Sequence, residues 1–285
     1  MASRDSSLDA VRSADGTSIA IHRSGSGTPL LLVHGALSDH TAWDSTAPLF
    51  AEQREVFAID RRGHPPSGGS AEYKPEREVD DLFAASMGLH TDVDVLAHSS
   101  GAVIALRAAE RGLPVRRLVL YEPPIMQLRI EARLPRDLSQ RIDALIASGD
   151  PAGAIDLFLR NGPQLGDTEI DALHNSRRWP AFLEMAPTVA YDARVVSEYA
   201  IERGHLAVVQ APVLFLVGSD SPPWYRRGID AIDHLLPNSR ILVMPGEGHN
   251  AMYSSPELLA AAVTGFLDES GPDGVFQLGG AEKPC

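Results

Sequence analysis

The chain has 285 residues, of which 44% are hydrophobic and 22% charged, a composition typical of one large α/β domain or two small ones. Its formal net charge is −13 and its positive charge clusters only in short, scattered arginine pairs, which argues against nucleic acid as a partner. The single cysteine, Cys285, excludes an intrachain disulfide and a cysteine-based metal site.

No apolar run approaches the roughly 20 residues that cross a bilayer, and the polar start MASRDSSLDA lacks the apolar core of a secretion signal. We therefore expect a cytoplasmic protein that does not contact a membrane.

The predicted elements alternate between strands and helices. The stretch 11–23 holds an Asp15-Gly16 turn between alternating segments, which predicts a hairpin. Short, nearly continuous apolar runs then indicate strands buried on both faces of a parallel sheet, at 29–35, 55–60, 93–98, 116–124, 211–218 and 240–246. Helical patterns lie between most of them, at about 39–52, 75–89, 99–112, 223–236 and 256–267. This order predicts a mostly parallel, doubly wound α/β sheet.

One long interval, between Glu122 and Val213, breaks the alternation. It shows helical patterning and turn residues but no clear strand. A loop of that length is improbable inside a compact domain, so the interval predicts an inserted helical cap. We expect a core in two parts, at 1–124 and 211–268, a cap at 125–210, and a flexible, Gly- and Pro-rich tail at 269–285.

Four polar residues follow or close these apolar runs, at the strand ends where open α/β sheets bind ligands. They are Ser99, His249, Glu122 and Asp220. A serine hydroxyl becomes nucleophilic when a base takes its proton, and the base needs an acid that fixes its tautomer and stabilises its charged form. The residues therefore predict Ser99 as nucleophile, His249 as base, and Glu122 or Asp220 as the acid.

Two backbone amides complete the predicted site. The negative charge of a tetrahedral intermediate needs N–H donors. Ser100, at the start of a predicted helix, and Ala36, in the sequence HGA, are placed to supply them. We expect the Ser100 side chain to be a helix cap or a packing group.

Three further residues are candidates for the substrate pocket: His34, which is also expected to orient the loop of Ala36, His98 beside the nucleophile, and Trp179 in the cap. Asp60 stands beside Arg61 and Arg62, which predicts a structural ion pair. The other histidines lack a ligand spacing with an acidic partner, so we expect no metal and no cofactor.

These motifs resemble the α/β-hydrolase superfamily over roughly residues 11–268. The matching pieces are HGALSDHTAW, DRRGHPPSG, AHSSG and GEGHN. The family's Gly-x-Ser-x-Gly elbow has alanine here at its first position, Ala97, a mild departure because the turn asks only for a small side chain. A second departure is Pro65, where related proteins often have glycine, and we expect it to stiffen that loop.

The resemblance leaves the acid open between Glu122 and Asp220. Family members commonly carry aspartate at the position that corresponds to Ser221, and Asp220 lies one residue earlier. A shift of one residue in extended backbone reverses the direction of a side chain. Glu122 in LYEPP resembles the arrangement of the zearalenone-type lactonases, and the two prolines after it hold the backbone extended. Glu122 is therefore favoured.

The resemblance implies a cofactor-independent serine hydrolase that cleaves a small-molecule carboxylic ester or lactone through an acyl-enzyme. A serine nucleophile argues against epoxide hydrolase and haloalkane dehalogenase chemistry, for which this fold uses aspartate. Two alternatives stay open. One is C–C hydrolysis, perhydrolase or cyclase/lyase chemistry in secondary metabolism on the same fold, and the other is a non-catalytic ligand-binding protein.

Overall fold

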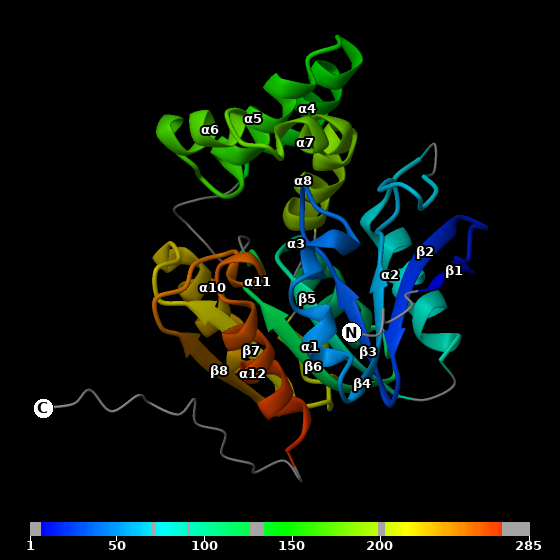
Figure 1. Cartoon of the computed structure of the whole chain (residues 1–285). Coiled ribbons are helices and arrows are strands. Elements are labelled where there is room, and N and C mark those ends of the chain that lie inside the picture. The colour runs from blue at the N-terminus through cyan, green and yellow to red at the C-terminus, as the bar shows by residue number, and fades with distance from the viewer. Residues whose placement is uncertain (1–6, 70–71, 90–91, 126–133, 199–202, 270–285) are drawn as a thin grey trace, which may run out of the picture.

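The computed structural model describes residues 7–69, 72–89, 92–125, 134–198 and 203–269. Its centre is an eight-stranded sheet with the order β1-β2-β4-β3-β5-β6-β7-β8 (Figure 1). Strands β1 and β2 form an antiparallel hairpin, and β2 also pairs antiparallel with β4. All other strand pairs of the sheet are parallel. This confirms the prediction of a mostly parallel sheet; the tail from residue 270 onward lies outside the described residues. The strands are β1 (Ser7–Arg12), β2 (Ser18–Gly25), β3 (Thr28–Val33), β4 (Arg54–Ile59), β5 (Val93–His98), β6 (Val115–Tyr121), β7 (Val213–Gly218) and β8 (Ser239–Met244).

The parallel strands send alternate side chains into two separate cores. In β3, Leu31 and Val33 pack into one core, and Leu30 and Leu32 pack into the other. All four side chains are fully buried. Because both faces of the sheet are covered, both faces must be apolar, and such a strand reads as a continuous hydrophobic run.

Helices cover both faces of the sheet. One face packs against α2 (Pro75–Met87), α3 (Ser100–Glu110) and α10 (Pro223–Asp233). The other packs against η1 (His40–Trp43), α1 (Ala47–Phe50), α11 (Ala251–Ser254) and α12 (Pro256–Leu267). None of the described helices is both long and apolar enough to cross a lipid bilayer.

The single helix predicted at about 39–52 is wrong, because the segment forms the 3-10 turn η1 and the short helix α1 instead. Asp39 caps the turn through the N–H of Thr41, at 2.8 Å. Pro48 stands at the second position of α1, where its ring is compatible with a helix start. A longer helix would place that ring against the carbonyl four residues earlier.

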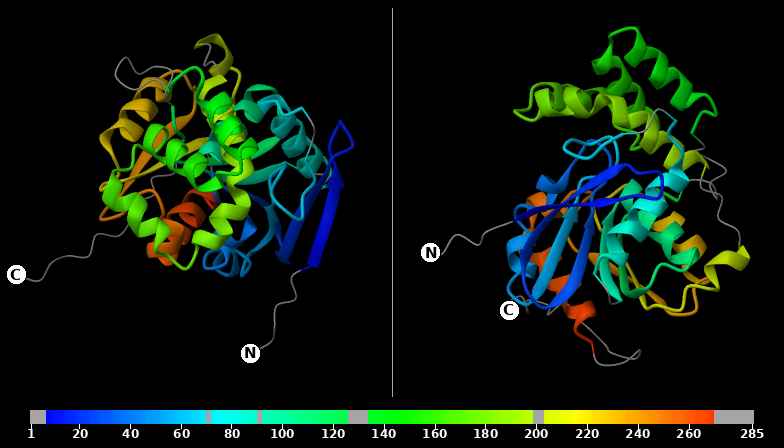
Figure 2. Two further views of the ribbon diagram at one scale, coloured as in Figure 1. Left: turned by 90° about the horizontal axis from the view of Figure 1, so that it is seen from above. Right: turned by 90° about the vertical axis from the view of Figure 1, so that its right-hand side faces the viewer.

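A second group of helices lies above the carboxyl ends of the strands, drawn in green at the top of Figure 1 and across the sheet edge in Figure 2. Between Glu122 and Val213, the described residues contain no strand. The contacts of α8 with α3 join this group to the core. Its members are α4 (Leu138–Ala147), α5 (Pro151–Asn161), α6 (Asp167–His174), α7 (Trp179–Met185), η2 (Ala186–Thr188) and α8 (Val189–Glu198), while the short helix α9 (Arg203–Leu206) lies beside the core, where Leu206 is buried (Figure 2). We refer to the helices from α4 to α8 as the cap.

Candidate active site

Ser99 lies at a sharp turn between β5 and α3. Its φ of +54° and ψ of −126° are values that residues other than glycine rarely adopt. The turn is held by its neighbours, because the Ser99 N–H donates to the carbonyl of Tyr121 and the Ser99 carbonyl accepts from the N–H of Ala102, both at 2.9 Å. Strain of this kind persists where the surrounding structure fixes it, and it is common at functional sites.

Small residues allow the backbone around Ser99 to pack closely. A Cβ on Gly101 would lie 2.3 Å from the carbonyl oxygen of His34, and a Cβ on Gly35 would lie 2.8 Å from the Cβ of Ser99. Ala97 is fully buried in β5. The methyl group that replaces the first glycine of the family's motif therefore fits without displacing the turn.

His249, in the loop after β8, is bonded to Glu122. Its Nδ1 lies 2.6 Å from Oε2 of Glu122, and Oε1 of the same carboxylate accepts from the Gly218 N–H at 2.8 Å. Glu122 is fully buried, whereas the His249 side chain is 22% exposed. A proton on Nδ1, donated to the carboxylate, leaves the lone pair of Nε2 free to accept a proton. The pair is arranged as a general base with its orienting acid.

Asp220, the other candidate acid, is exposed and bonded elsewhere. Its Oδ1 accepts from the Ser219 hydroxyl at 2.8 Å, and its backbone N–H donates to the carbonyl of Glu247 at 2.9 Å. The structure therefore places Glu122, and not Asp220, against His249.

The loop that carries His249 is fixed by two side chains from the ends of neighbouring strands. His98 donates from Nε2 to the carbonyl of His249 at 2.8 Å. Tyr121 donates its hydroxyl proton to the carbonyl of Gly248 and accepts from the N–H of Ala251. Burial holds the pKa of His98 well below its ordinary value, so the ring is neutral and Nε2 carries its proton. His98 also lines the cavity described below.

Ala36 and Ser100 line the same cavity as Ser99 and His249. In the part of the chain that the structure describes, no hydrogen bond engages the backbone N–H of either residue. Ser100 is the first residue of α3, where the helix dipole adds partial positive charge. Both amides are therefore available to a developing oxyanion.

Two residues predicted to line the pocket lie elsewhere. His34 is fully buried beneath the loop of Ala36, and both of its ring nitrogens bond to backbone groups, at 2.8 and 3.1 Å. Trp179 packs within the cap, where its ring centroid is 4.1 Å from that of His174 and 6.5 Å from that of Phe182. Neither is among the lining residues. Aromatic packing and backbone hydrogen bonds satisfy these two rings away from the cavity.

The cavity has a volume of about 570 Å³ and takes its lining from the cap and the core. Most of the lining is apolar, and the catalytic candidates supply much of the polar remainder. This character suits a small molecule with a hydrocarbon body. The larger apolar lining residues are Leu37, Leu134, Phe158, Leu159, Leu165, Leu173, Phe182, Val196, Trp224 and Met252.

Sequence reasoning missed Tyr225, which contacts the catalytic face of His249. Its hydroxyl is 3.4 Å from Nε2, and the two rings stack with centroids 4.8 Å apart. Burial raises the pKa of Tyr225 well above its ordinary value, so the hydroxyl keeps its proton and donates it. The aromatic pair Trp224-Tyr225, directly after the loop of Asp220, is the signal that marked this position.

The Tyr225 hydroxyl lies 3.4 Å from Nε2 of His249, the nitrogen that is expected to take the proton of Ser99. Among the described residues, none forms a hydrogen bond with Oγ of Ser99. Catalytic hydrogen bonds are often long in ligand-free structures and shorten when substrate binds. The missing bond at Oγ therefore does not argue against Ser99 as the nucleophile.

A buried ionic network behind Ser100 was also missed. Arg61 donates to both oxygens of Glu78, at 2.6 and 2.9 Å, and to Oδ1 of Asp192 at 2.9 Å. The Ser100 hydroxyl donates to the same oxygen of Asp192 at 2.7 Å, so its side chain is neither a helix cap nor an apolar packing group. Arg61 and Glu78 are each 2% exposed and Asp192 is fully buried. Because Asp192 belongs to α8, the network joins the cap to the first residue of α3.

Removing the cation from this network is expected to cost much stability, because Glu78 and Asp192 would remain as buried carboxylates. We expect Arg61→Met to lower the free energy of unfolding by about 3–5 kcal/mol in urea denaturation. The matched control, Arg160→Met, breaks an exposed pair with Asp167 and should leave the unfolding midpoint almost unchanged. Equal midpoints for Arg61→Met and wild type would show that the network adds no net stability.

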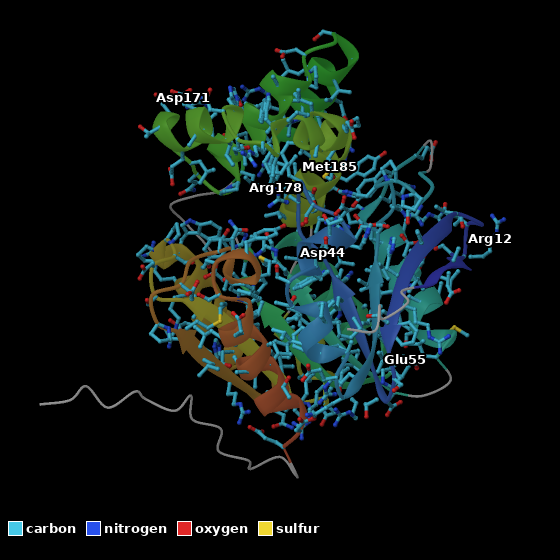
Figure 3. The ribbon with its side chains drawn as sticks, in the orientation of Figure 1. Arg12, Asp44, Glu55, Asp171, Arg178 and Met185 are labelled. Carbon is cyan, nitrogen blue, oxygen red and sulfur yellow. The ribbon has the colours of Figure 1, made fainter. Side chains whose placement is uncertain are left out.

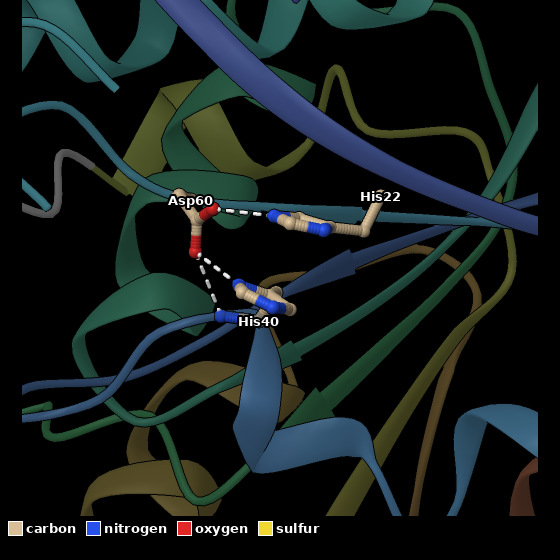
Figure 4. A group of neighbouring side chains, drawn as sticks. All are labelled: His22, His40 and Asp60. Atoms are coloured by element: carbon tan, nitrogen blue, oxygen red, sulfur yellow. Dashed lines mark hydrogen bonds and ion pairs between the residues drawn. The ribbon is translucent and has the colours of Figure 1, made fainter. Parts of the chain in front are cut away.

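The predicted ion pair of Asp60 with Arg61 and Arg62 is wrong. Figure 4 shows the Asp60 carboxylate between two histidines. Nε2 of His22 is 2.7 Å from Oδ2, while Nδ1 and the backbone N of His40 are 2.8 and 2.9 Å from Oδ1. The antiparallel pairing of β2 with β4 brings His22 to the end of β4, and the arginines bond to other carboxylates.

Among the described residues, His22, His40 and Asp60 form a group whose ligand atoms lie within 4.8 Å of one another, close enough to surround a metal ion. The two imidazole rings stack, however, with centroids 3.3 Å apart and an interplanar angle of 11°. Imidazole binds a metal through a ring-nitrogen lone pair, which lies in the ring plane. An ion in the plane of one ring would lie outside the plane of the other. The stacked arrangement favours two N–H donors on one carboxylate.

The shared hydrogen bonds move two pKa values in opposite directions. Burial by itself lowers the pKa of His40, but the hydrogen bond and charge of Asp60 outweigh it, so this pKa is raised. Burial by itself raises the pKa of Asp60, but the hydrogen bonds from His40 and His22 outweigh it, so this pKa is lowered. The pair therefore stabilises the fold between the lowered pKa of the acid and the raised pKa of the histidine.

We expect the stability lost in His40→Gln to depend on pH. The His40 contribution is fully present below the ordinary pKa of histidine and disappears as the pH rises through the raised pKa, whereas the Asp60 contribution disappears at low pH. The difference in unfolding free energy between wild type and variant should therefore be largest near about pH 5 and shrink in the alkaline range. Urea denaturation across the pH range measures it, with the exposed His234→Gln as control. A difference that does not vary with pH would contradict the pairing.

The chain is similar to one protein family and to individual proteins of known sequence or structure. A family model described as "Alpha/beta hydrolase family" matches residues 30–262. The N-formylmaleamate deformylase of Pseudomonas putida is 28% identical over 253 residues, which cover 86% of this chain and 90% of that protein. An alpha/beta hydrolase from Sphaerobacter thermophilus superimposes with a TM-score of 0.84 at 33% identity, over 91% of this chain and 100% of that one. An esterase from Exiguobacterium antarcticum shares the fold, with a TM-score of 0.69 at 19% identity over 91% and 99% of the two chains.

Proposed function

The chain belongs to the alpha/beta hydrolase family, and from that premise we propose that it is a serine hydrolase that cleaves a carboxylic ester or lactone through an acyl-enzyme. The observation that carries the proposal is the hydrogen bond of the buried Glu122 to His249, which lines the same cavity as the strained Ser99. No cofactor enters the proposed reaction.

In the proposed acylation, Oγ of Ser99 attacks the carbonyl carbon of the substrate while Nε2 of His249 takes the hydroxyl proton. The carboxylate of Glu122 stabilises the imidazolium that forms. The oxyanion receives hydrogen bonds from the backbone amides of Ala36 and Ser100. These interactions strengthen as charge develops, so they act mainly on the transition state.

The leaving alkoxide then takes the proton from His249, which completes the acyl-enzyme and frees the alcohol. In the second half, His249 removes a proton from water, and the hydroxide attacks the acyl carbon. Collapse of this intermediate returns the proton to Oγ of Ser99 and releases the carboxylic acid. A lactone follows the same steps, except that its alcohol stays joined to the acyl group until water releases the hydroxy acid.

Hydrolysis of an N-acyl amide is the second candidate function. The observation that favours it is the 28% identity to a protein named as a deformylase, over most of both chains. An amide needs the same nucleophile and oxyanion donors, but its amine leaves only when His249 protonates it. The two functions therefore differ in the leaving group and not in the residues.

Covalent labelling tests the proposal. A fluorophosphonate probe should modify Ser99, identified by mass spectrometry of the labelled peptide, and p-nitrophenyl butyrate should give a burst of nitrophenol before steady turnover. Labelling confined to another serine would overturn the proposal, and a ligand-binding protein would show neither labelling nor burst. Comparison of kcat/KM for a formate ester and the matching formanilide separates the two candidate functions.

A further inference from the structure

Arg178 lies on the underside of the cap, directly before α7. It lines the cavity that contains Ser99 and His249, and its side chain is exposed at the mouth of that cavity. Figure 3 shows Arg178 where the cap faces the core. Among the described lining residues, it is the only lysine or arginine.

Two aromatic rings hold the guanidinium of Arg178 in place. Its central carbon is 4.4 Å from the ring centroid of Tyr253 and 5.3 Å from that of Phe182. One Nη2 proton goes to the hydroxyl of Tyr253, at 2.9 Å. Tyr253 belongs to α11, the short helix that begins just after His249. The guanidinium is therefore fixed relative to this histidine. Stacking on aromatic faces positions an arginine without neutralising its charge.

No carboxylate in the described part of the chain pairs with Arg178. The two other arginines of the cap helices whose partners are known both have one, because Arg160 pairs with Asp167 and Arg194 pairs with Asp143. A positioned arginine with unused N–H donors can accept an anion in the bidentate geometry that matches a carboxylate.

One acidic residue that lines this cavity would repel an anionic ligand. Glu169 also lines it, and its Oε2 accepts the N–H of Gly166 at the start of α6. This bond directs the carboxylate toward its own helix terminus and occupies one of its oxygens. The aromatic rings, in contrast, leave the N–H donors of Arg178 other than the one bonded to Tyr253 unoccupied, so the local arrangement favours an anion beside Arg178.

Resting on the proposed hydrolase function, we propose that the substrate carries a free carboxylate remote from the scissile bond and that Arg178 binds it. The apolar body of the substrate occupies the cavity, with its acyl carbon at Ser99 and its carboxylate at the mouth. Because this ion pair is the same in the ground state and the transition state, it lowers KM and leaves kcat little affected. The substrate class is therefore an anionic ester, such as the monoester of a dicarboxylic acid.

A matched pair of esters tests the inference: mono(p-nitrophenyl) glutarate, which is anionic, and its methyl ester, which is neutral. Wild type should prefer the anionic ester by about 10- to 100-fold in kcat/KM, the range of a charge-assisted hydrogen bond. Arg178→Gln should lose that preference through KM for the anionic ester, and Arg178→Lys should recover part of it. Arg177→Gln, which removes a neighbouring charge that does not line the cavity, should keep the preference.

A second measurement separates the inference from the proposed hydrolysis. Calorimetric titration of glutarate into Ser99→Ala and into Ser99→Ala/Arg178→Gln follows anion binding without turnover. Loss of glutarate binding on adding Arg178→Gln supports the inference even if the wild type hydrolyses no ester. Absence of ester hydrolysis would overturn only the hydrolase proposal. Equal binding by both variants would overturn the inference. An equal loss of kcat/KM on both esters in Arg178→Gln would also overturn it. That result would mean that Arg178 serves to hold the cap against Tyr253 and does not bind an anion.

Discussion

Replacing Ser99 by alanine is expected to reduce kcat for ester hydrolysis by about 10⁶-fold, the scale found when a serine nucleophile is removed. The variant keeps the cavity and the oxyanion amides but has no oxygen to form an acyl-enzyme. Since Oγ takes part in no hydrogen bond among the described residues, its removal should leave the fold intact. Turnover of p-nitrophenyl butyrate and the urea midpoint measure the two effects separately.

A double substitution provides the control. When two residues act in the same chemical step, removing either one removes most of the rate acceleration of that step. Adding His249→Asn to Ser99→Ala should therefore lower kcat little further. Multiplicative losses would mean that the two residues act independently, contrary to the proposed proton transfer. Full activity in purified Ser99→Ala would remove Ser99 from the mechanism.

Glu122→Gln is expected to reduce kcat by about 10⁴-fold. The glutamine oxygen can keep the bond from the Gly218 N–H, which leaves the amide NH₂ facing Nδ1 of His249. An NH₂ group donates a proton, so Nδ1 must accept and the ring proton moves to Nε2. A histidine protonated on Nε2 cannot take the proton of Ser99, and the neutral amide cannot stabilise an imidazolium.

Asp220→Asn is the matched comparison for this result. Its carboxylate is exposed and bonds to Ser219, so the variant should retain kcat within a few-fold. Steady-state kinetics on one ester, with both variants at equal stability, decides between the acids. A large loss in Asp220→Asn alone would assign the orienting role to Asp220 and leave Glu122 as a structural group.

The parallel core could be predicted from the sequence because its signal is local. The strands from β3 to β7 read as nearly continuous apolar runs, since both faces of the sheet are covered, and the polar residues after these runs meet at one edge. Ser99 and His249 are therefore found by position and residue type. The split of 39–52 into η1 and α1 also has a local signal, because Pro48 favours the start of a helix over its interior.

The contacts that distinguish this site could not be predicted, because they join distant segments. Spacing leaves Glu122 and Asp220 nearly equal, and only the fold shows which carboxylate reaches His249. Asp60 stands next to two arginines in the chain, yet strand pairing brings it to His22. Asp192 meets Ser100 across 92 residues of sequence. The pattern of residue types along one sequence does not show which distant residues come into contact.

The bond between Asp192 and Ser100 limits how the molecule can acquire new specificity. Exchange of the cap segment is the simplest way to reshape the cavity while the core is kept. Here a foreign cap without an acid at this position of α8 would remove the carboxylate that accepts from both Arg61 and the Ser100 hydroxyl, next to the amide proposed to bind the oxyanion. The two halves of the protein are thus not independent modules, and any recombination or directed evolution of the cap has to carry this carboxylate with it.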